Sequence, residues 1–226
     1  MTPYGLYLTH ESRVIVLGLP RYGKTRLVRD TLTADCTRVI YHDVIGHDYY
    51  APGRLPLSIT ELEAHRYMLD DEFVKLVVIA RDAGDPDSLT DEVGRIIDLI
   101  YPRPGRMVVV FDEVGRHHRK SEKILNSIFA TGNHFGIVPI LCSQKATDIP
   151  LGTRITASDV YSFGQHHPKE LGALYDCYGD IYASKVAVLH RGDSCVHWRE
   201  SEREQWWSEK ARYKFKQVVL TDEIAA

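Results

Sequence analysis

The sequence feature that most constrains this chain is the motif G-x-x-x-x-G-K-T at residues 18–25. Gly18 and Gly23 bracket four residues, and Lys24 and Thr25 follow directly. Glycines let the backbone fold closely around a phosphate, so that several N–H groups point inward at it. A helix that starts at the loop adds partial positive charge. The motif therefore predicts a loop that binds the phosphates of a nucleotide.

The segments on both sides of the motif fit this interpretation. Residues 13–17 form a β-branched apolar run that predicts a buried strand, and residues 24–34 predict a helix. In such a loop we expect Lys24 to reach the β- and γ-phosphates and the Thr25 hydroxyl to bind Mg²⁺. The predicted nucleotide-binding residues are Gly18, Leu19, Pro20, Arg21, Tyr22, Gly23, Lys24, Thr25 and Arg26.

Composition narrows the class of protein further. A formal net charge of −3 over 226 residues excludes a generally basic surface, so any contact with nucleic acid must use a local patch. The four cysteines are scattered, with no C-x-x-C pair, which favours a reducing compartment. The first residues resemble no signal peptide, and no apolar run approaches 18 residues. We therefore expect a cytosolic protein, or one carried in a particle, without a membrane span.

Apolar strands alternate with amphipathic helices along the chain, which predicts an α/β fold with a mostly parallel central sheet flanked by helices. We expect an N-terminal leader over residues 1–12, with an edge strand at 4–8, one domain over 13–200 and a C-terminal extension over 201–226. Further predicted strands cover residues 37–41, 73–80, 107–111, 137–142 and 160–163. Predicted helices include residues 58–70, 93–100, 124–129 and 168–178, and residues 185–190 and 194–198 are predicted to form a hairpin.

Polar side chains follow two of the predicted strands. Asp112 and Glu113 end the apolar run at residues 107–111, and Gln144 ends the run at 137–142. Ligands bind outside the carboxyl ends of strands in open α/β sheets. We expect Asp112 to hold the Mg²⁺ shell, Glu113 to orient and deprotonate an attacking water, and Gln144 to sense the γ-phosphate or position that water.

These motifs, in this order, resemble the FtsK–HerA superfamily of DNA-pumping ATPases. The segments that carry the resemblance are residues 14–25, 112–113, 136–144, 154–163 and 167–171. In compactness the chain is most similar to the genome-packaging ATPases of membrane-containing icosahedral viruses. The resemblance implies a RecA-like (ASCE) P-loop core that binds ATP and Mg²⁺, and a homo-oligomeric ring of five or six subunits that hydrolyses ATP between subunits. It further implies double-stranded DNA in the pore, a capsid vertex or membrane-associated portal protein as partner, and a location in the host cytoplasm or the virion.

The sequence departs from that family at one point. FtsK-type members carry an arginine just before the strand that ends in glutamine, whereas Asn133 and His134 occupy that neighbourhood here. By motif position we expect Arg154 to reach the nucleotide of the next subunit, with Arg116 and Arg119 as the other candidates. An arginine supplied in trans is worth roughly 10³–10⁵ in rate in related enzymes.

The densest basic cluster precedes the predicted helix at residues 124–129. Cations near a helix N-terminus oppose its dipole, so helix stability does not explain their position. A polyanion in a ring pore would compensate them, and the alternative is pairing with surface acids such as Glu122. The predicted nucleic-acid contacts are Arg116, His117, His118, Arg119 and Lys120.

Other functions are compatible with a phosphate-binding loop. Residues 112–115 spell D-x-x-G, and residues 143–148 echo the guanine-reading N-K-x-D motif defectively, so a GTP-binding switch is the sharpest alternative. A nucleotide or small-molecule kinase and a module that binds ATP without hydrolysing it are two others. Within the motor class, a plasmid-transfer or filamentous-phage assembly ATPase remains open.

Overall fold

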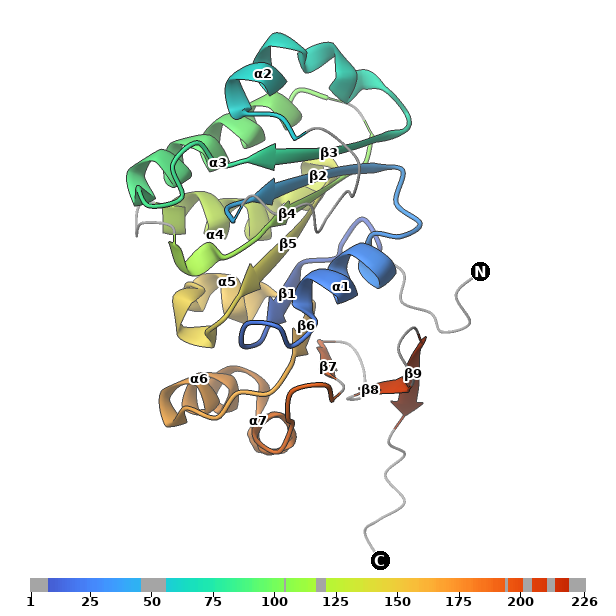
Figure 1. The fold of residues 1–226 in the computed structure, drawn as a ribbon, viewed down its shortest axis with the longest axis vertical. Coiled ribbons are helices and arrows are strands. Elements are labelled where there is room, and N and C mark those ends of the chain that lie inside the picture. The colour runs from blue at the N-terminus through green and yellow to red at the C-terminus, as the bar shows by residue number, and fades with distance from the viewer. Residues whose placement is uncertain are drawn as a thin grey trace, which may run out of the picture.

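A computed structural model describes residues 8–45, 56–103, 105–116, 121–193 and 195–200, and the backbone of strands at 205–210 and 214–219. These ranges contain a nine-stranded sheet in the order β3-β2-β4-β5-β1-β6-β7-β8-β9 (Figure 1). The strands are β1 (Val14–Leu17), β2 (Arg38–Asp43), β3 (Val74–Ile79), β4 (Met107–Phe111), β5 (Ile137–Ser143), β6 (Asp159–Ser162), β7 (Val196–Arg199), β8 (Gln205–Lys210) and β9 (Lys214–Val219).

Seven α-helices accompany the sheet in the same ranges. They are α1 (Lys24–Leu27), α2 (Ile59–Ala64), α3 (Pro86–Ile100), α4 (Ser121–Thr131), α5 (Leu151–Thr156), α6 (Pro168–Tyr178) and α7 (Asp180–Ala187). A π-helical turn at Val28–Leu32 continues α1. None of the helices described is long and apolar enough to cross a bilayer.

The six strands from β3 to β6 run parallel, and β7, β8 and β9 run antiparallel to their neighbours. The predicted α/β class and mostly parallel sheet are therefore confirmed. The predicted edge strand at residues 4–8 lies almost entirely outside the described residues.

The predicted hairpin at residues 185–198 is wrong. Residues 185–187 of its first half belong to α7, whose Tyr182, Ala183 and Val186 turn one helical face into the core, and residues 188–190 form no strand. Its second half contains β7, which pairs with β6 instead of with residues 185–190. A short apolar run does not distinguish a buried helix from a strand. Two antiparallel strands, β8 and β9, do lie in the predicted C-terminal extension.

The helix predicted over residues 58–70 is also only partly right. Ser58 caps α2 as its spacing predicts: the Glu61 amide donates to Ser58 Oγ at 3.2 Å and the Ser58 amide donates to Glu61 Oε2 at 2.7 Å. The α-helix ends at Ala64, and residues 66–70 form a 3₁₀ turn.

Side chains of the parallel strands alternate between two apolar layers. Ile15 and Leu17 pack in the larger cluster, together with α2, α3, α4, α6 and α7. Val14 and Val16 point to the opposite face, where α1 and the π-helical turn cover them (Figure 1). Every residue of β1, β4 and β5 is buried, as expected for strands covered on both faces. Burying each large aliphatic side chain contributes about 1.5–3 kcal/mol, so these strands hold their carboxyl ends in fixed positions.

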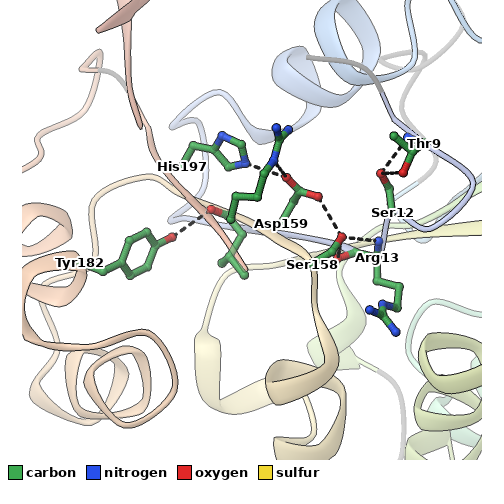
Figure 2. A network of polar contacts seen from close by, with 9 residues as sticks. Thr9, Ser12, Arg13, Ser158, Asp159, Tyr182 and His197 are labelled. Carbon is green, nitrogen blue, oxygen red and sulfur yellow. Dashed lines mark hydrogen bonds and ion pairs between the residues drawn. The ribbon is translucent and has the colours of Figure 1, made fainter. Parts of the chain in front are cut away.

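A buried ionic cluster attaches β7 to the parallel sheet. Asp159, at the start of β6, accepts hydrogen bonds from His197 Nε2 at 2.9 Å and Arg199 Nε at 2.8 Å. Figure 2 shows the Asp159 carboxylate between His197 on one side and Ser158 on the other. The His197 ring stacks on Tyr161 with centroids 4.1 Å apart. Asp159, His197 and Arg199 are called the β6–β7 cluster below.

Candidate active site

The phosphate loop joins the carboxyl end of β1 to α1. Lys24 is buried, and its Nζ donates to the carbonyl oxygen of Gly18 at 2.7 Å, so the ammonium lies against the inside of the loop. Gly23 has φ 107°, in the left-handed region that glycine adopts without strain. A Cβ on Gly18 would lie 2.7 Å from the Cβ of Phe163, so only glycine fits there. Both glycines are thus required by this backbone.

A cationic cleft adjoins the loop. Gly23, Lys24 and Thr25 line it, together with the side chains of three arginines, Arg21, Arg26 and Arg29. Arg26, on α1, and Arg29, on the π-helical turn that continues it, both contact Asp30. Sequence reasoning included Arg21 and Arg26 and missed Arg29. Arg29 could have been found from its position three residues after Arg26, because residues at i and i+3 lie on the same face of a helix.

The two acids follow β4 on a constrained backbone. Asp112 and Glu113 are 6% and 8% exposed. The Asp112 amide donates to the His42 carbonyl oxygen at 3.1 Å, and the Glu113 amide donates to Asp112 Oδ1 at 3.0 Å. Glu113 has φ 50°, a left-handed conformation that is uncommon for a residue with a side chain and costs on the order of 1–3 kcal/mol. Such strain is typical of functional sites, and here it sets the direction of the Glu113 side chain.

Gln144 lies between the loop and the acids, because β5 separates β1 from β4. Its neighbour Ser143 accepts a hydrogen bond from the Gly18 amide at 3.1 Å through its carbonyl oxygen. On the other side, Gln144 Nε2 donates to Glu113 Oε2 at 2.9 Å. The structure therefore brings together, at one edge of the sheet, three features that are more than 30 residues apart in the sequence.

Two residues that the sequence reasoning missed hold the turn that contains Gln144. Glu170, on α6, accepts hydrogen bonds from the Thr147 amide at 2.9 Å and from its hydroxyl at 2.7 Å. Gln165 Nε2 donates to the carbonyl oxygen of Gln144 at 2.8 Å. Glu170 lies in the segment 167–171 that carries the family resemblance, but no local spacing links it or Gln165 to the turn, because the return of the chain through β6 brings both residues there.

The predicted ligands of Mg²⁺ suit that ion. Asp112 supplies one buried carboxylate at the end of β4, and Thr25 supplies one hydroxyl at the start of α1. Mg²⁺ typically takes one or two such protein ligands, and nucleotide phosphates and water complete its shell. Among the described residues, no group of three or more His, Cys, Asp or Glu side chains is arranged to hold a metal ion by itself.

Arg154 does not join this group of residues. It lies on α5, where its Nε donates to the Ile149 carbonyl oxygen at 3.1 Å and its Nη1 to the Ala173 carbonyl oxygen at 3.2 Å. Its guanidinium also contacts Cys177 Sγ at 3.6 Å. In this conformation Arg154 ties α5 to α6 within its own subunit, and its action on a neighbouring nucleotide stays a prediction.

Most of the predicted nucleic-acid cluster, residues 117–120, lies outside the described residues. Arg116 is described and exposed, in a 3₁₀ turn directly after the acids. Its amide donates to the Glu113 carbonyl oxygen at 2.9 Å. The described end of the cluster is therefore joined through the backbone to the predicted water-activating residue.

Comparison with known proteins yields similarity of structure rather than of sequence. No protein-family model matches the chain, and no curated protein sequence matches it. The genome packaging NTPase B204 from Sulfolobus turreted icosahedral virus 2, in complex with ATP-gammaS, has a TM-score of 0.69 at 17% identity over 91% of this chain and 100% of that chain. VirB4 of Thermoanaerobacter pseudethanolicus has a TM-score of 0.67 at 11% identity over 91% of this chain and 93% of that chain.

A larger protein contains the same fold. The cytoplasmic domain of the Thermomonospora curvata Type VII secretion ATPase EccC has a TM-score of 0.57 at 13% identity, over 99% of this chain and 28% of that chain. Identities this low establish the fold alone. At that level the predicted resemblance to the packaging ATPases of icosahedral viruses is confirmed.

Proposed function

We propose that this protein hydrolyses ATP to move double-stranded DNA, and that it packages a viral genome. The observation that carries the proposal is the hydrogen bond between Gln144 and Glu113, at the sheet edge that also bears the phosphate loop. A carboxylate held beside a triphosphate is suited to activating water rather than to binding alone. The structural similarity to a genome packaging NTPase supports the same choice.

Each residue of the site has a defined task in this reaction. The loop amides and Lys24 hold the β- and γ-phosphates, with Lys24 exchanging the Gly18 carbonyl for phosphate oxygens. Glu113 accepts a proton from water while the water oxygen bonds to the γ-phosphorus and the bond from that phosphorus to the ADP oxygen breaks. Gln144 holds the carboxylate that takes the proton. Thr25 and Asp112 would hold Mg²⁺, which would supply positive charge against the phosphate oxygens.

Assembly into a ring of five or six subunits is part of the proposal, since it provides a pore for DNA and a trans-acting arginine. With a net charge of −3, DNA contact must be local, and Arg116 with the basic residues at 117–120 is the proposed contact. The proposed setting is the host cytoplasm or the virion, with a capsid vertex or portal protein as the docking partner.

Arg154 remains our proposed trans-acting residue, and the bonds it makes to α6 sharpen its test. Arg154→Ala is expected to retain nucleotide binding and to lose hydrolysis. Arg154 also ties two helices together, so thermal unfolding must be measured on the same sample. A variant that unfolds earlier but keeps full turnover per folded molecule would assign Arg154 a structural function only, leaving Arg116 and Arg119 as candidates.

Phosphate release from ATP and from GTP, each with and without duplex DNA, tests the proposed function. We expect ATP turnover that duplex DNA stimulates, and Lys24→Ala is expected to abolish it by weakening nucleotide binding. Strict GTP preference would indicate a switch, and transfer to an acceptor without free phosphate would indicate a kinase. Binding without turnover under every condition would leave a nucleotide-binding module.

A further inference from the structure

A buried glutamine stands behind the Gln144–Glu113 pair. Gln165 follows β6, and only 1% of its surface is exposed. Its Nε2 donates to the main-chain carbonyl oxygen of Gln144 at 2.8 Å. A buried amide group lowers stability unless it is hydrogen-bonded, so this side chain is committed to that carbonyl.

Gln165 thus holds the main chain of Gln144, and the side chain of Gln144 in turn holds Glu113, the predicted base. Gln144 Nε2 donates to Glu113 Oε2 at 2.9 Å, so two consecutive hydrogen bonds connect Gln165 to the carboxylate. Glu113, Gln144 and Gln165 are called the carboxyl-edge cluster below. The left-handed backbone of Glu113 sets the direction of its side chain, and the hydrogen bond from Gln144 fixes the position of the carboxylate at its end.

The segment that carries Gln165 also supports the phosphate loop. Two residues earlier, Phe163 packs under the loop: ideal Cβ atoms on Gly18 and Gly23 would lie 2.7 Å and 3.2 Å from its side chain. The Phe163 amide also donates to the Leu17 carbonyl oxygen at 2.8 Å. The short stretch 163–165 thus fixes the position of Gln144 relative to the phosphate loop.

From this arrangement we infer that Gln165 is a positioning residue for hydrolysis. It fixes the Gln144 backbone, so that the Gln144 amide aims the Glu113 carboxylate at the attacking water. This inference rests on the proposed function, and it assigns to Gln165 no contact with the nucleotide. A displacement of about 1 Å at a reacting group can lower a rate by roughly 10²-fold, so a small shift of the turn at 143–148 is sufficient for a measurable effect.

A double-mutant cycle tests the inference. Gln165→Met keeps the length of the side chain and removes its donor, and Gln144→Leu removes the amide through which Gln165 acts. We expect Gln165→Met to lower kcat about tenfold, within the range that small displacements produce, with KM for ATP changed less than about twofold. In the Gln144→Leu background, measured with radiolabelled ATP, Gln165→Met is expected to change kcat by less than about twofold, because coupled residues are non-additive.

A matched control separates positioning from loss of stability. Thr33 is fully buried at the far end of the helical segment that starts at the phosphate loop, and its hydroxyl bonds the Val28 carbonyl oxygen at 2.9 Å and the Tyr41 hydroxyl at 2.6 Å. Thr33→Val removes both of these buried hydrogen bonds without touching the carboxyl-edge cluster. Its kcat per folded molecule is expected to equal that of the parent protein.

Three results would overturn the inference. They are an unchanged kcat in Gln165→Met, a change confined to KM, and an equal loss of kcat with and without Gln144. If Gln165→Met folds poorly, Gln165→Leu, which also removes the donor and buries no charge, is held to the same criteria per folded molecule. If instead Glu113→Gln hydrolyses ATP at the parental rate, the proposed function fails, whatever Gln165 does.

Discussion

Two buried carboxylates in this molecule are held in opposite ways. In the carboxyl-edge cluster, Glu113 accepts a hydrogen bond from a neutral amide and sits on a strained backbone. In the β6–β7 cluster, Asp159 accepts hydrogen bonds from Arg199 and His197 on an unstrained strand. A carboxylate paired with a guanidinium is electrostatically satisfied, whereas one held by an amide is oriented but not neutralised.

We interpret this difference as that between a candidate catalytic cluster, the carboxyl-edge cluster, and a structural one, the β6–β7 cluster. Asp159 links β6, the last parallel strand, to the antiparallel strand β7. A neutralised carboxylate at this position contributes stability. In the proposed reaction Glu113 accepts a proton, which a neutralising cation at hydrogen-bond distance would oppose. We therefore expect substitutions in the carboxyl-edge cluster to change rate, and substitutions in the β6–β7 cluster to change stability.

Among substitutions in the two clusters, the largest effect is expected from Glu113→Gln. An amide cannot accept the proton of the attacking water, and a general base contributes about 10²–10⁴ in rate, so phosphate release at saturating ATP should fall by that factor. Nucleotide affinity and the thermal midpoint should change little. In the same assay, Asp159→Asn should keep its kcat per folded molecule. A comparable loss of kcat in both variants would remove the distinction between the two clusters.

The next effect concerns stability. Asp159→Ala leaves His197 and Arg199 without their shared acceptor, and breaking a buried ion pair in this way costs about 3–5 kcal/mol. Urea unfolding followed by circular dichroism measures it. Substituting the exposed Glu72 by alanine is the control and should change the unfolding free energy by less than about 0.5 kcal/mol. Equal stability of the two variants would contradict a structural function for the β6–β7 cluster.

Low pH should reduce the stability that the β6–β7 cluster provides. Burial acts to raise the pKa of Asp159, but hydrogen bonds and charge from His197 and Arg199 outweigh it and leave the pKa lowered. An acid whose pKa is lowered by folding stabilises the fold at every pH above its pKa in the unfolded state, which is about 3.9 for aspartate. This contribution is lost as the pH falls through the pKa in the folded state. The stability difference between the parent protein and Asp159→Asn should thus be largest at neutral pH and should narrow below about pH 4. A difference that widens in acid would reverse the assignment.

The smallest effect is expected beside the carboxyl-edge cluster. Burial raises the pKa of Asp148, whose carboxylate abuts Gly115 and accepts a hydrogen bond from Ser143 Oγ at 3.3 Å. An acid whose pKa is higher in the folded state stabilises the fold at low pH. This contribution is lost as the pH rises from the pKa in the unfolded state to the pKa in the folded state. At pH 7 the free energy of unfolding of Asp148→Asn should therefore exceed that of the parent protein by less than about 0.5 kcal/mol. At pH 3 the two free energies should be equal. Melting curves at the two pH values test the sign.

Local patterns in the sequence predicted much of the site and less of its surroundings. Residues 18–25 were placed correctly between a strand and a helix, and the acids after β4 and the glutamine after β5 were placed correctly at the ends of strands. These predictions succeeded because each depends on one short segment and on the rule that parallel strands end together. Residues 185–190 were assigned to a strand wrongly: residues 185–187 end α7, whose Tyr182 and Val186 pack in the core, and residues 188–190 form no strand.

The sequence by itself determined that a glycine-bracketed loop lies between a strand and a helix, that one strand ends in two acids and that strands alternate with helices. Only the tertiary structure decided that β5 lies between β1 and β4, that Gln165 holds Gln144 and that Arg154 is bound to α6. The physical reason is distance along the chain. Hydrogen bonds between residues some 20 to 30 positions apart depend on how the strands are ordered, and no local spacing encodes that order.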